Sequence, residues 1–130
     1  QGLIRGDFER GEIEMLLDCS WDIVEMKLDT AQNALFLLVN QNDTTIALYR
    51  YDLDAKGLPR LVRTEKVGRR GFYGDALFSP DGSIVALRDY YEDRYLILPL
   101  DANLPMVSMP LMAEVDFYTT MQVVWGPYVE

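Results

Sequence analysis

The sequence predicts an all-β fold, a segment of a β-propeller with two full four-stranded blades and partial blades at both ends. Three observations support this prediction. Two motifs recur with a period of roughly 46 to 50 residues, which is the length of a propeller blade. Each period contains four segments rich in β-branched and aromatic residues. No segment combines a helical apolar stripe with capping residues.

The first motif is the end of one strand, a tight turn and the start of the next strand. Residues 53–59 (LDAKGLP) match residues 100–105 (LDANLP), which are shorter by one turn residue. Residues 3–11 (LIRGDFERG) align in turn with residues 48–57 (LYRYDLDAKG). A strand, a turn ending in glycine and a second strand over 13–17 form a hairpin.

The second motif is a turn that leads into an apolar strand. Residues 78–83 (FSPDGS) place a proline at the second turn position and a glycine where positive φ is needed. Residues 28–33 (LDTAQN) occupy the same place fifty residues earlier, with a weaker turn sequence, and residues 124–127 (VWGP) repeat its start.

These motifs predict the strands and their grouping along a single unit of residues 1–130. Residues 1–19 end one blade, 20–66 and 67–112 form two full blades, and 113–130 contain the first strand of another. The expected strands of the first full blade are 23–28, 34–40, 45–52 and 60–64; those of the second are 73–78, 84–88, 94–100 and 106–110.

The incomplete blades at both ends predict that further blades complete the propeller ring. A propeller closes as a ring of about four to eight blades, and uncovered strand edges invite pairing with another chain. The ring is therefore completed either by the rest of a longer polypeptide or by other copies of this chain. We favour the longer polypeptide, because terminal repeats in self-contained arrays are usually adapted as caps.

Composition excludes several classes of function. The chain has no histidine and one cysteine, so Ser-His-Asp, Cys-His and histidine-ligated zinc chemistry cannot arise within it. We therefore expect no enzyme activity, no metal and no cofactor. A net charge of −9 argues against nucleic acid as a partner. The longest apolar run, residues 34–39, is too short for a membrane helix. No secretory signal is visible, which favours the cytoplasm without determining the compartment.

An ordered set of motifs resembles the propeller of prolyl oligopeptidase-type (S9) serine peptidases and their TolB-like relatives. The set is residues 21–25 (WDIVE), 38–43 (LVNQND), 58–60 (LPR) and 76–82 (ALFSPDG). In that family the propeller is a non-catalytic lid that admits short peptides to a separate α/β-hydrolase domain. The resemblance therefore implies a binding or gating module within a larger peptidase-like protein. It transfers no catalytic residue, because this chain has no Gly-x-Ser-x-Gly motif. The alternative is a stand-alone protein-interaction scaffold that completes its propeller by oligomerisation.

Two sets of residues are candidates for binding a partner, such as a peptide or protein. Five basic residues lie within eleven positions, and Arg69 and Arg70 are the sharper pair, because connections between blades often face the central channel; the others are Arg60, Arg63 and Lys66. Tyr90 and Tyr91 lie at an expected hairpin tip, where exposed tyrosines are good recognition groups. The alternatives are a solvated connection for the arginines and packing of the blade tip for the tyrosines.

Two further features have plain structural interpretations. Residues 52–57 (DLDAKG) begin like a calcium loop, but Lys56 stands where an oxygen ligand belongs, so we interpret them as a hairpin turn. Trp21 and Trp125 occupy strand positions, and we expect them to pack within or between blades.

Overall fold

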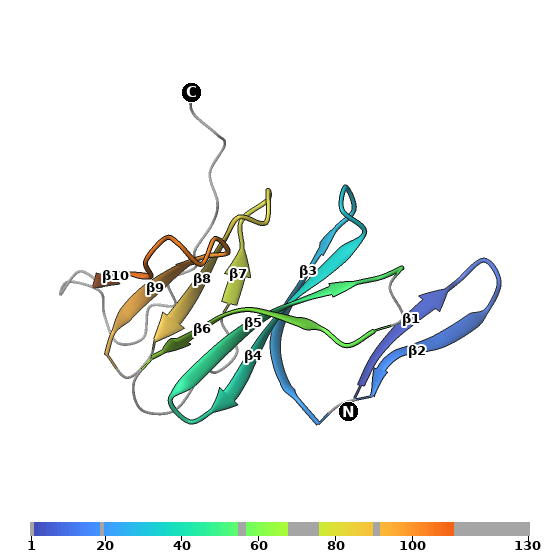
Figure 1. The fold of residues 1–130 in the computed structure, drawn as a ribbon, viewed down its shortest axis with the longest axis horizontal. Helices are drawn as coiled ribbons and strands as arrows, with labels where there is room; N and C mark the ends of the chain where they lie inside the picture. Colours follow the sequence, from blue (N-terminus) through green and yellow to red (C-terminus); the bar gives the residue numbers. More distant parts are fainter. Residues whose placement is uncertain (1, 19, 55–56, 68–75, 90–91, 111–130) are drawn as a thin grey trace, which may run out of the picture.

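The computed structural model describes residues 2–18, 20–54, 57–67, 76–89 and 92–110. Within these residues the chain is all-β, as predicted, and forms three antiparallel sheets (Figure 1). We call them the hairpin sheet (β1–β2), the middle sheet (β3–β6) and the third sheet (β7–β10). Each four-stranded sheet keeps its strands in chain order. Their bounds are β1 Gly2–Asp7, β2 Glu12–Asp18, β3 Asp22–Asp29, β4 Ala34–Asn42, β5 Thr45–Asp52, β6 Arg60–Lys66, β7 Ala76–Phe78, β8 Ile84–Asp89, β9 Arg94–Pro99 and β10 Val107–Pro110.

The predicted strands are confirmed wherever the structure describes them, with ends that differ by up to two residues. The four strands expected over 23–64 are β3 to β6, and those expected over 84–110 are β8 to β10. Of the strand expected over 73–78, the structure describes only its end as β7. The strand expected within 113–130 lies outside the described residues, as does Trp125.

Tight turns join the strands, and their residues adopt the backbone angles that the sequence demands. Gly82 and Gly11 have φ of 72° and 67°, a region that costs glycine nothing. Asn33 takes the equivalent place in the turn between β3 and β4, with φ of 48°. The side chain of Asp29 supports this turn by accepting hydrogen bonds from the Ala31 and Gln32 amides. Aspartate and asparagine thus replace the Ser-Pro-Asp-Gly chemistry of the later turn.

The central strand β4 of the middle sheet is buried on both faces. Successive side chains of a strand point to opposite sides, and each side of β4 faces an apolar core. On one side, Leu37 and Val39 of β4 belong to an apolar core shared with the hairpin sheet. On the other side, Phe36 and Leu38 belong to a larger core shared with the third sheet. The unbroken apolar run of β4 is therefore explained by burial on two faces rather than one.

The hairpin sheet is fastened to the middle sheet by apolar contacts and one hydrogen bond. Leu3 and Leu17 are cross-strand partners whose side chains enter the shared core. The Tyr51 hydroxyl of β5 donates a hydrogen bond of 2.9 Å to the Leu16 carbonyl. Trp21 packs on Tyr49 at 4.4 Å between ring centroids, and both rings lie against the core shared with the hairpin sheet. The expected packing role of Trp21 is therefore confirmed.

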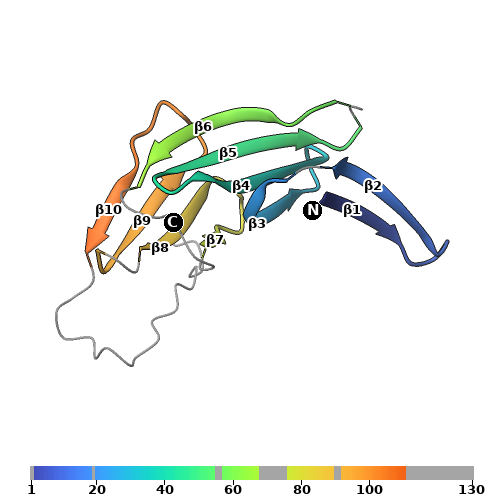
Figure 2. The same cartoon turned by 90° about the horizontal axis from the view of Figure 1, so that it is seen from below.

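The first strands of the two four-stranded sheets approach each other. β3 and β7 are in contact, whereas β6 and β10 lie at the outer edges of their sheets (Figures 1 and 2). The three sheets therefore follow one another face to face. This arrangement decides which side chains are exposed.

Candidate functional site

The four partner-binding residues named from the sequence, Arg69, Arg70, Tyr90 and Tyr91, lie outside the described residues. The predictions for them therefore stay predictions. The structure does describe the strands on either side of positions 90–91, and it describes three of the five basic residues.

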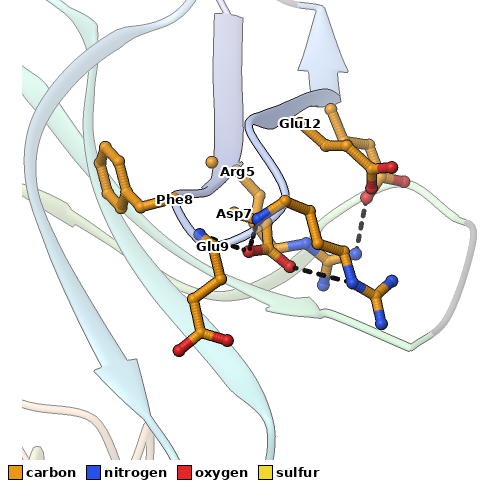
Figure 3. A pocket seen from close by; sticks show the side chains of 8 residues that line it. Arg5, Asp7, Phe8, Glu9 and Glu12 are labelled. Carbon is orange, nitrogen blue, oxygen red and sulfur yellow. Dashed lines mark hydrogen bonds and ion pairs between the residues drawn. The ribbon is translucent and has the colours of Figure 1, made fainter.

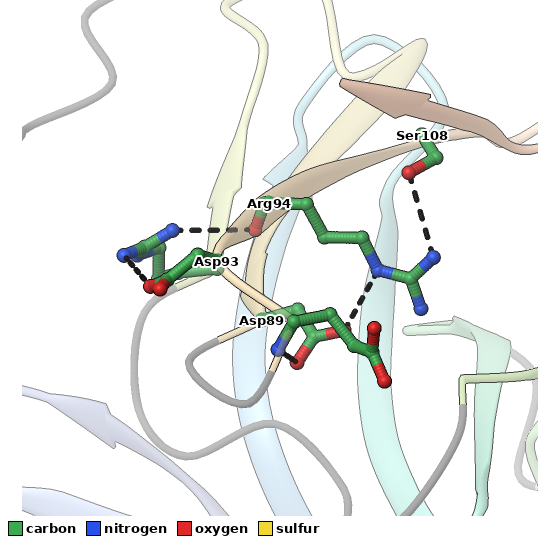
Figure 4. A network of polar contacts seen from close by, with 6 residues as sticks. Asp89, Asp93, Arg94 and Ser108 are labelled. Carbon is green, nitrogen blue, oxygen red and sulfur yellow. Dashed lines mark hydrogen bonds and ion pairs between the residues drawn. The ribbon is translucent and has the colours of Figure 1, made fainter. Parts of the chain in front are cut away.

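A network of polar contacts surrounds the hairpin between β8 and β9 (Figure 4). Buried Asp89 accepts a hydrogen bond of 2.8 Å from Arg94 Nε and one of 3.3 Å from the Glu92 amide. Arg88 donates to Asp93 at 3.2 Å, and Arg94 reaches Ser108 of β10 at 3.5 Å. Opposite charges thus close both sides of the hairpin end and tie it to the next strand.

This network fixes the described residues on either side of positions 90 and 91. Asp93 adopts φ of 47°, which an aspartate tolerates better than most residues. The Arg88 guanidinium also lies 5.4 Å from the centre of the Tyr95 ring, at a distance that suits a cation–π contact. The described charged side chains at this hairpin end therefore stabilise the hairpin itself.

One member of the predicted basic patch proves to be internal, which corrects its assignment to the surface. Arg63 is only 8% exposed. Its Nη1 donates to three carbonyls of the β9–β10 connection, those of Pro99 at 2.8 Å, Asp101 at 3.0 Å and Leu104 at 2.9 Å. Its Nη2 forms an ion pair with Glu65. Arg63 therefore joins the middle sheet to a turn of the third sheet and cannot contact a partner.

Arg60 and Lys66, the other described members of this patch, are exposed at the two ends of β6. The pairing of β6 with β5 is irregular between Arg60 and Arg63, opposite Leu48 and Tyr49. The sequence carried no signal for the burial of Arg63, because its carbonyl partners lie 36 to 41 residues away.

The Phe-Ser-Pro-Asp-Gly turn is a closed hydrogen-bonded unit. Asp81 Oδ1 accepts from the Ser79 hydroxyl at 2.6 Å, the Ser83 hydroxyl at 2.8 Å and the Ser83 amide at 3.0 Å. The Ser79 hydroxyl in turn accepts from the Ile84 amide at 3.1 Å. These donors, the Ser79 hydroxyl foremost, lower the pKa of Asp81 from 3.8 to about 2.

We expect acid to weaken this turn in a narrow pH window. Because the pKa of Asp81 is lowered in the folded state, its ionised form stabilises the fold above pH 4, and this contribution disappears as the pH falls toward 2. Asp81→Asn should lower the melting temperature at pH 7 and flatten its decline between pH 4 and pH 2. Circular dichroism melts from pH 7 to pH 2 measure both effects.

A second variant checks the cause. Ser79→Ala removes the strongest donor, so the pKa of Asp81 in the folded state should rise toward 3.8. The loss of stability below pH 4 should then be smaller and should end at a higher pH. An unchanged pH profile in both variants would contradict the role assigned to this carboxylate.

A hollow of about 480 Å³ lies at the tip of the hairpin sheet (Figure 3). Arg5 pairs with Glu14 at 2.6 Å across the two strands, and Arg10 lies 3.8 Å from Asp7. The Asp7 carboxylate also accepts hydrogen bonds from the Glu9 and Arg10 amides, each at 3.0 Å. Both arginines of the hollow are thus engaged within the hairpin, and the arrangement is explained by turn geometry.

Exposed apolar side chains gather on the two outer faces of the stack of sheets. On the hairpin sheet, Ile4 and Met15 are cross-strand partners, and Ile13 beside them is 77% exposed. On the third sheet, Val107 and Met109 are exposed on β10. Scattered apolar residues are normal on a surface, but apolar side chains that share one sheet face indicate contact with another structure.

The sequence contains a local signal for the exposed apolar face of the hairpin sheet. In residues 12–15 (EIEM) acidic and apolar residues alternate, which is the pattern of a strand with one apolar face. The bulge between Leu3 and Ile4 shifts the pairing register of β1 and β2. The alternation alone therefore does not determine which side chains of the two strands share the exposed face.

The loop that begins like a calcium site is a turn in its described part. Asp52 accepts a hydrogen bond of 2.8 Å from Arg50, and Asp54 is exposed. Across the described ranges, no three acidic, cysteine or histidine side chains come together as a metal site would require. No helix suited to crossing a membrane occurs in this part of the chain either.

Comparison with known proteins adds no relative to this description. No family model, no curated protein and no solved structure matches the chain.

Proposed function

We propose that the three sheets are consecutive blades of a β-propeller and that the chain is a non-catalytic binding or gating module of a larger S9 peptidase-like protein. The middle sheet carries this proposal. Its central strands β4 and β5 have buried side chains on both faces, packed toward the two neighbouring sheets, which is the environment of a blade within a ring. The first strands β3 and β7 lie side by side, as strands around a central channel would.

The two outer faces support the same proposal. Residues 3–7 align with residues 48–52 of β5, so Ile4 corresponds to Tyr49, which packs toward the preceding sheet. The exposed face around Ile4, Ile13 and Met15 is thus the counterpart of a face that is covered in the middle sheet. Further blades would cover it, and likewise the face around Val107 and Met109.

The peptidase part of the proposal rests on the ordered motifs of the sequence. The Phe-Ser-Pro-Asp-Gly turn is supported as a structural unit, but such a turn recurs among propellers of many functions. A gating role belongs to a ring as a whole, so the present residues would contribute channel lining and packing. Catalysis would come from a separate hydrolase domain.

The full product of the parent reading frame tests this function. We expect electron microscopy to show a ring of about four to eight blades joined to a second domain that carries a Gly-x-Ser-x-Gly elbow. Peptide hydrolysis should favour short substrates, and this preference should weaken when the blades are deleted. A reading frame that ends without a hydrolase domain would contradict the peptidase role, and the absence of a ring would contradict the blades.

A second candidate function is a stand-alone interaction scaffold. The two outer faces correspond to the two sides of one repeated interface, so a head-to-tail contact between copies is geometrically consistent. This candidate predicts a defined oligomer of the 130-residue chain that dissociates when Ile13→Lys and Met15→Lys are introduced. A stable monomer at micromolar concentration in light scattering would exclude it.

A further inference from the structure

The turn between β4 and β5 contains a motif that the blade proposal does not use. Residues 42–44 (NDT) place a threonine two positions after an asparagine, with no proline between them. Asn-x-Ser/Thr is the acceptor sequence for N-linked glycosylation. The chain has four asparagines, and Asn42 is the one followed by a serine or threonine at this spacing; the others are Asn33, Asn40 and Asn103.

The side chain of Asn42 uses its oxygen in the turn and leaves its nitrogen free. Asn42 Oδ1 accepts a hydrogen bond of 3.0 Å from the Thr44 amide and one of 3.1 Å from the Thr44 hydroxyl. Within the described residues, Asn42 Nδ2 has no hydrogen-bond partner. The nitrogen that would react is therefore available, and the hydroxyl that defines the motif already contacts the same carboxamide.

Turn geometry does not require an amide nitrogen at this position. Aspartate has the same role in other described turns. Asp29 Oδ1 accepts a hydrogen bond of 3.1 Å from the Ala31 amide. Asp101 Oδ1 accepts one of 2.9 Å from the Asn103 amide. A carboxylate has only oxygen acceptors, so the carboxamide of Asn42 adds a nitrogen that the turn does not use.

The turn is exposed, and a hydrogen bond from the next strand holds its backbone. Residues 42–44 are all exposed, and they lie at the opposite end of β4 from the turn that contains Asn33 (Figure 1). The Thr44 carbonyl accepts a hydrogen bond of 2.9 Å from the amide of Val67, a buried core residue. Neighbouring sheets pack against the faces of β4, whereas this turn lies at its end. A large group on Nδ2 would thus extend into solvent without separating the sheets.

We propose that Asn42 is an N-glycosylation site of this protein. The donor is a saccharide linked to a lipid diphosphate, and an oligosaccharyltransferase catalyses the transfer. Asn42 Nδ2 attacks the anomeric carbon, so a C–N bond forms while the bond between that carbon and the diphosphate oxygen breaks. The electron pair of the broken bond leaves with the lipid diphosphate, and Nδ2 loses one proton to a base of the transferase. The Thr44 hydroxyl distinguishes Asn42 from the other asparagines.

The linkage is compatible with the folded turn. The substituted Nδ2 keeps one N–H, and Oδ1 keeps both hydrogen bonds from Thr44. Attachment therefore breaks no described contact of the turn and adds a bulky, solubilising group to the surface. The site goes beyond the binding or gating role proposed above and does not depend on the blade arrangement.

The 130-residue chain, preceded by a secretory leader and produced in mammalian cells, tests the acceptor chemistry. We expect the secreted protein to carry one saccharide, detected as an increase in mass that peptide-N-glycosidase removes. This hydrolysis converts the modified asparagine to aspartate, and peptide mass spectrometry should locate the conversion at position 42. The circular dichroism spectrum should be the same before and after removal, because the hydrogen bonds of the turn persist.

Matched variants identify the motif as the cause. Thr44→Val removes the hydroxyl and should abolish the modification, whereas Thr44→Ser keeps a hydroxyl and should retain it. Thr45→Val changes the adjacent threonine, which lies outside the motif, and should leave the modification unchanged. Circular dichroism checks that each variant folds.

Three results would contradict the site. The first is a secreted wild-type chain without a saccharide on Asn42, and the second is a modification that persists in Thr44→Val. The third is an unmodified Asn42 in the full product of the parent reading frame isolated from its own cells, where a saccharide on Asn42 would support the site. None of these outcomes bears on the ring of blades, which electron microscopy tests separately.

Discussion

Replacing Arg63 by alanine should destabilise the protein by about 3 kcal/mol, although the residue lies on a strand near the edge of its sheet. The substitution leaves the carbonyls of Pro99, Asp101 and Leu104 without their buried donor. It also leaves Glu65 without its ion-pair partner. Urea unfolding followed by circular dichroism measures the free-energy change.

Two companion variants separate charge from geometry. Arg63→Lys keeps the positive charge but has no planar fork that can serve three carbonyls and a carboxylate, so roughly half of the loss should remain. Arg60→Ala, at an exposed position of the same strand, should change stability by no more than about 0.5 kcal/mol. Equal stabilities for Arg63→Ala and Arg60→Ala would contradict the joining role of Arg63.

Replacing either of two adjacent leucines of β4 by alanine should lower the free energy of unfolding by about 2 to 5 kcal/mol. The two replacements should nevertheless destabilise different parts of the molecule. Leu37 and Leu38 are both fully buried, but they belong to the two separate cores. Leu37→Ala creates a cavity facing the hairpin sheet, and Leu38→Ala creates one facing the third sheet. The free energy lost should be similar because the side chains and their burial are the same.

Amide hydrogen exchange distinguishes the two variants. Exchange should accelerate in β1 and β2 for Leu37→Ala, and in β7 to β9 for Leu38→Ala. Leu61→Ala, a half-exposed position on β6, serves as the control and should cost less than about 1 kcal/mol. Identical exchange patterns in the two β4 variants would mean that the cores do not unfold separately.

The strands and turns of this protein could be predicted because their signals are local. Glycine adopts positive φ without steric cost, as Gly82 does, and a turn with proline, aspartate and glycine favours the separation of two strands. The repeat of residues 53–59 at 100–105 then groups the strands in fours without any knowledge of their packing. The same reasoning missed Asn33 as a substitute for glycine, because asparagine adopts this conformation only in part of its occurrences.

The candidate sites were less accessible to sequence reasoning. Charge clustering suggested a surface around Arg63, and the structure buries that side chain against a turn of the next sheet. Nothing in the sequence distinguishes Met26 and Leu28 from buried strand residues. Their exposure depends on which part of the middle sheet the hairpin sheet covers.

The sequence by itself thus determined the all-β class, the order of the strands and the residues of the turns, since these depend on side-chain alternation and on backbone preferences within a few residues. Only the tertiary structure decided which face of each strand is covered and which carbonyls accept hydrogen bonds from Arg63. These features depend on contacts between residues far apart in the chain. Such contacts are set by the way twisted sheets stack, which no short stretch of sequence encodes.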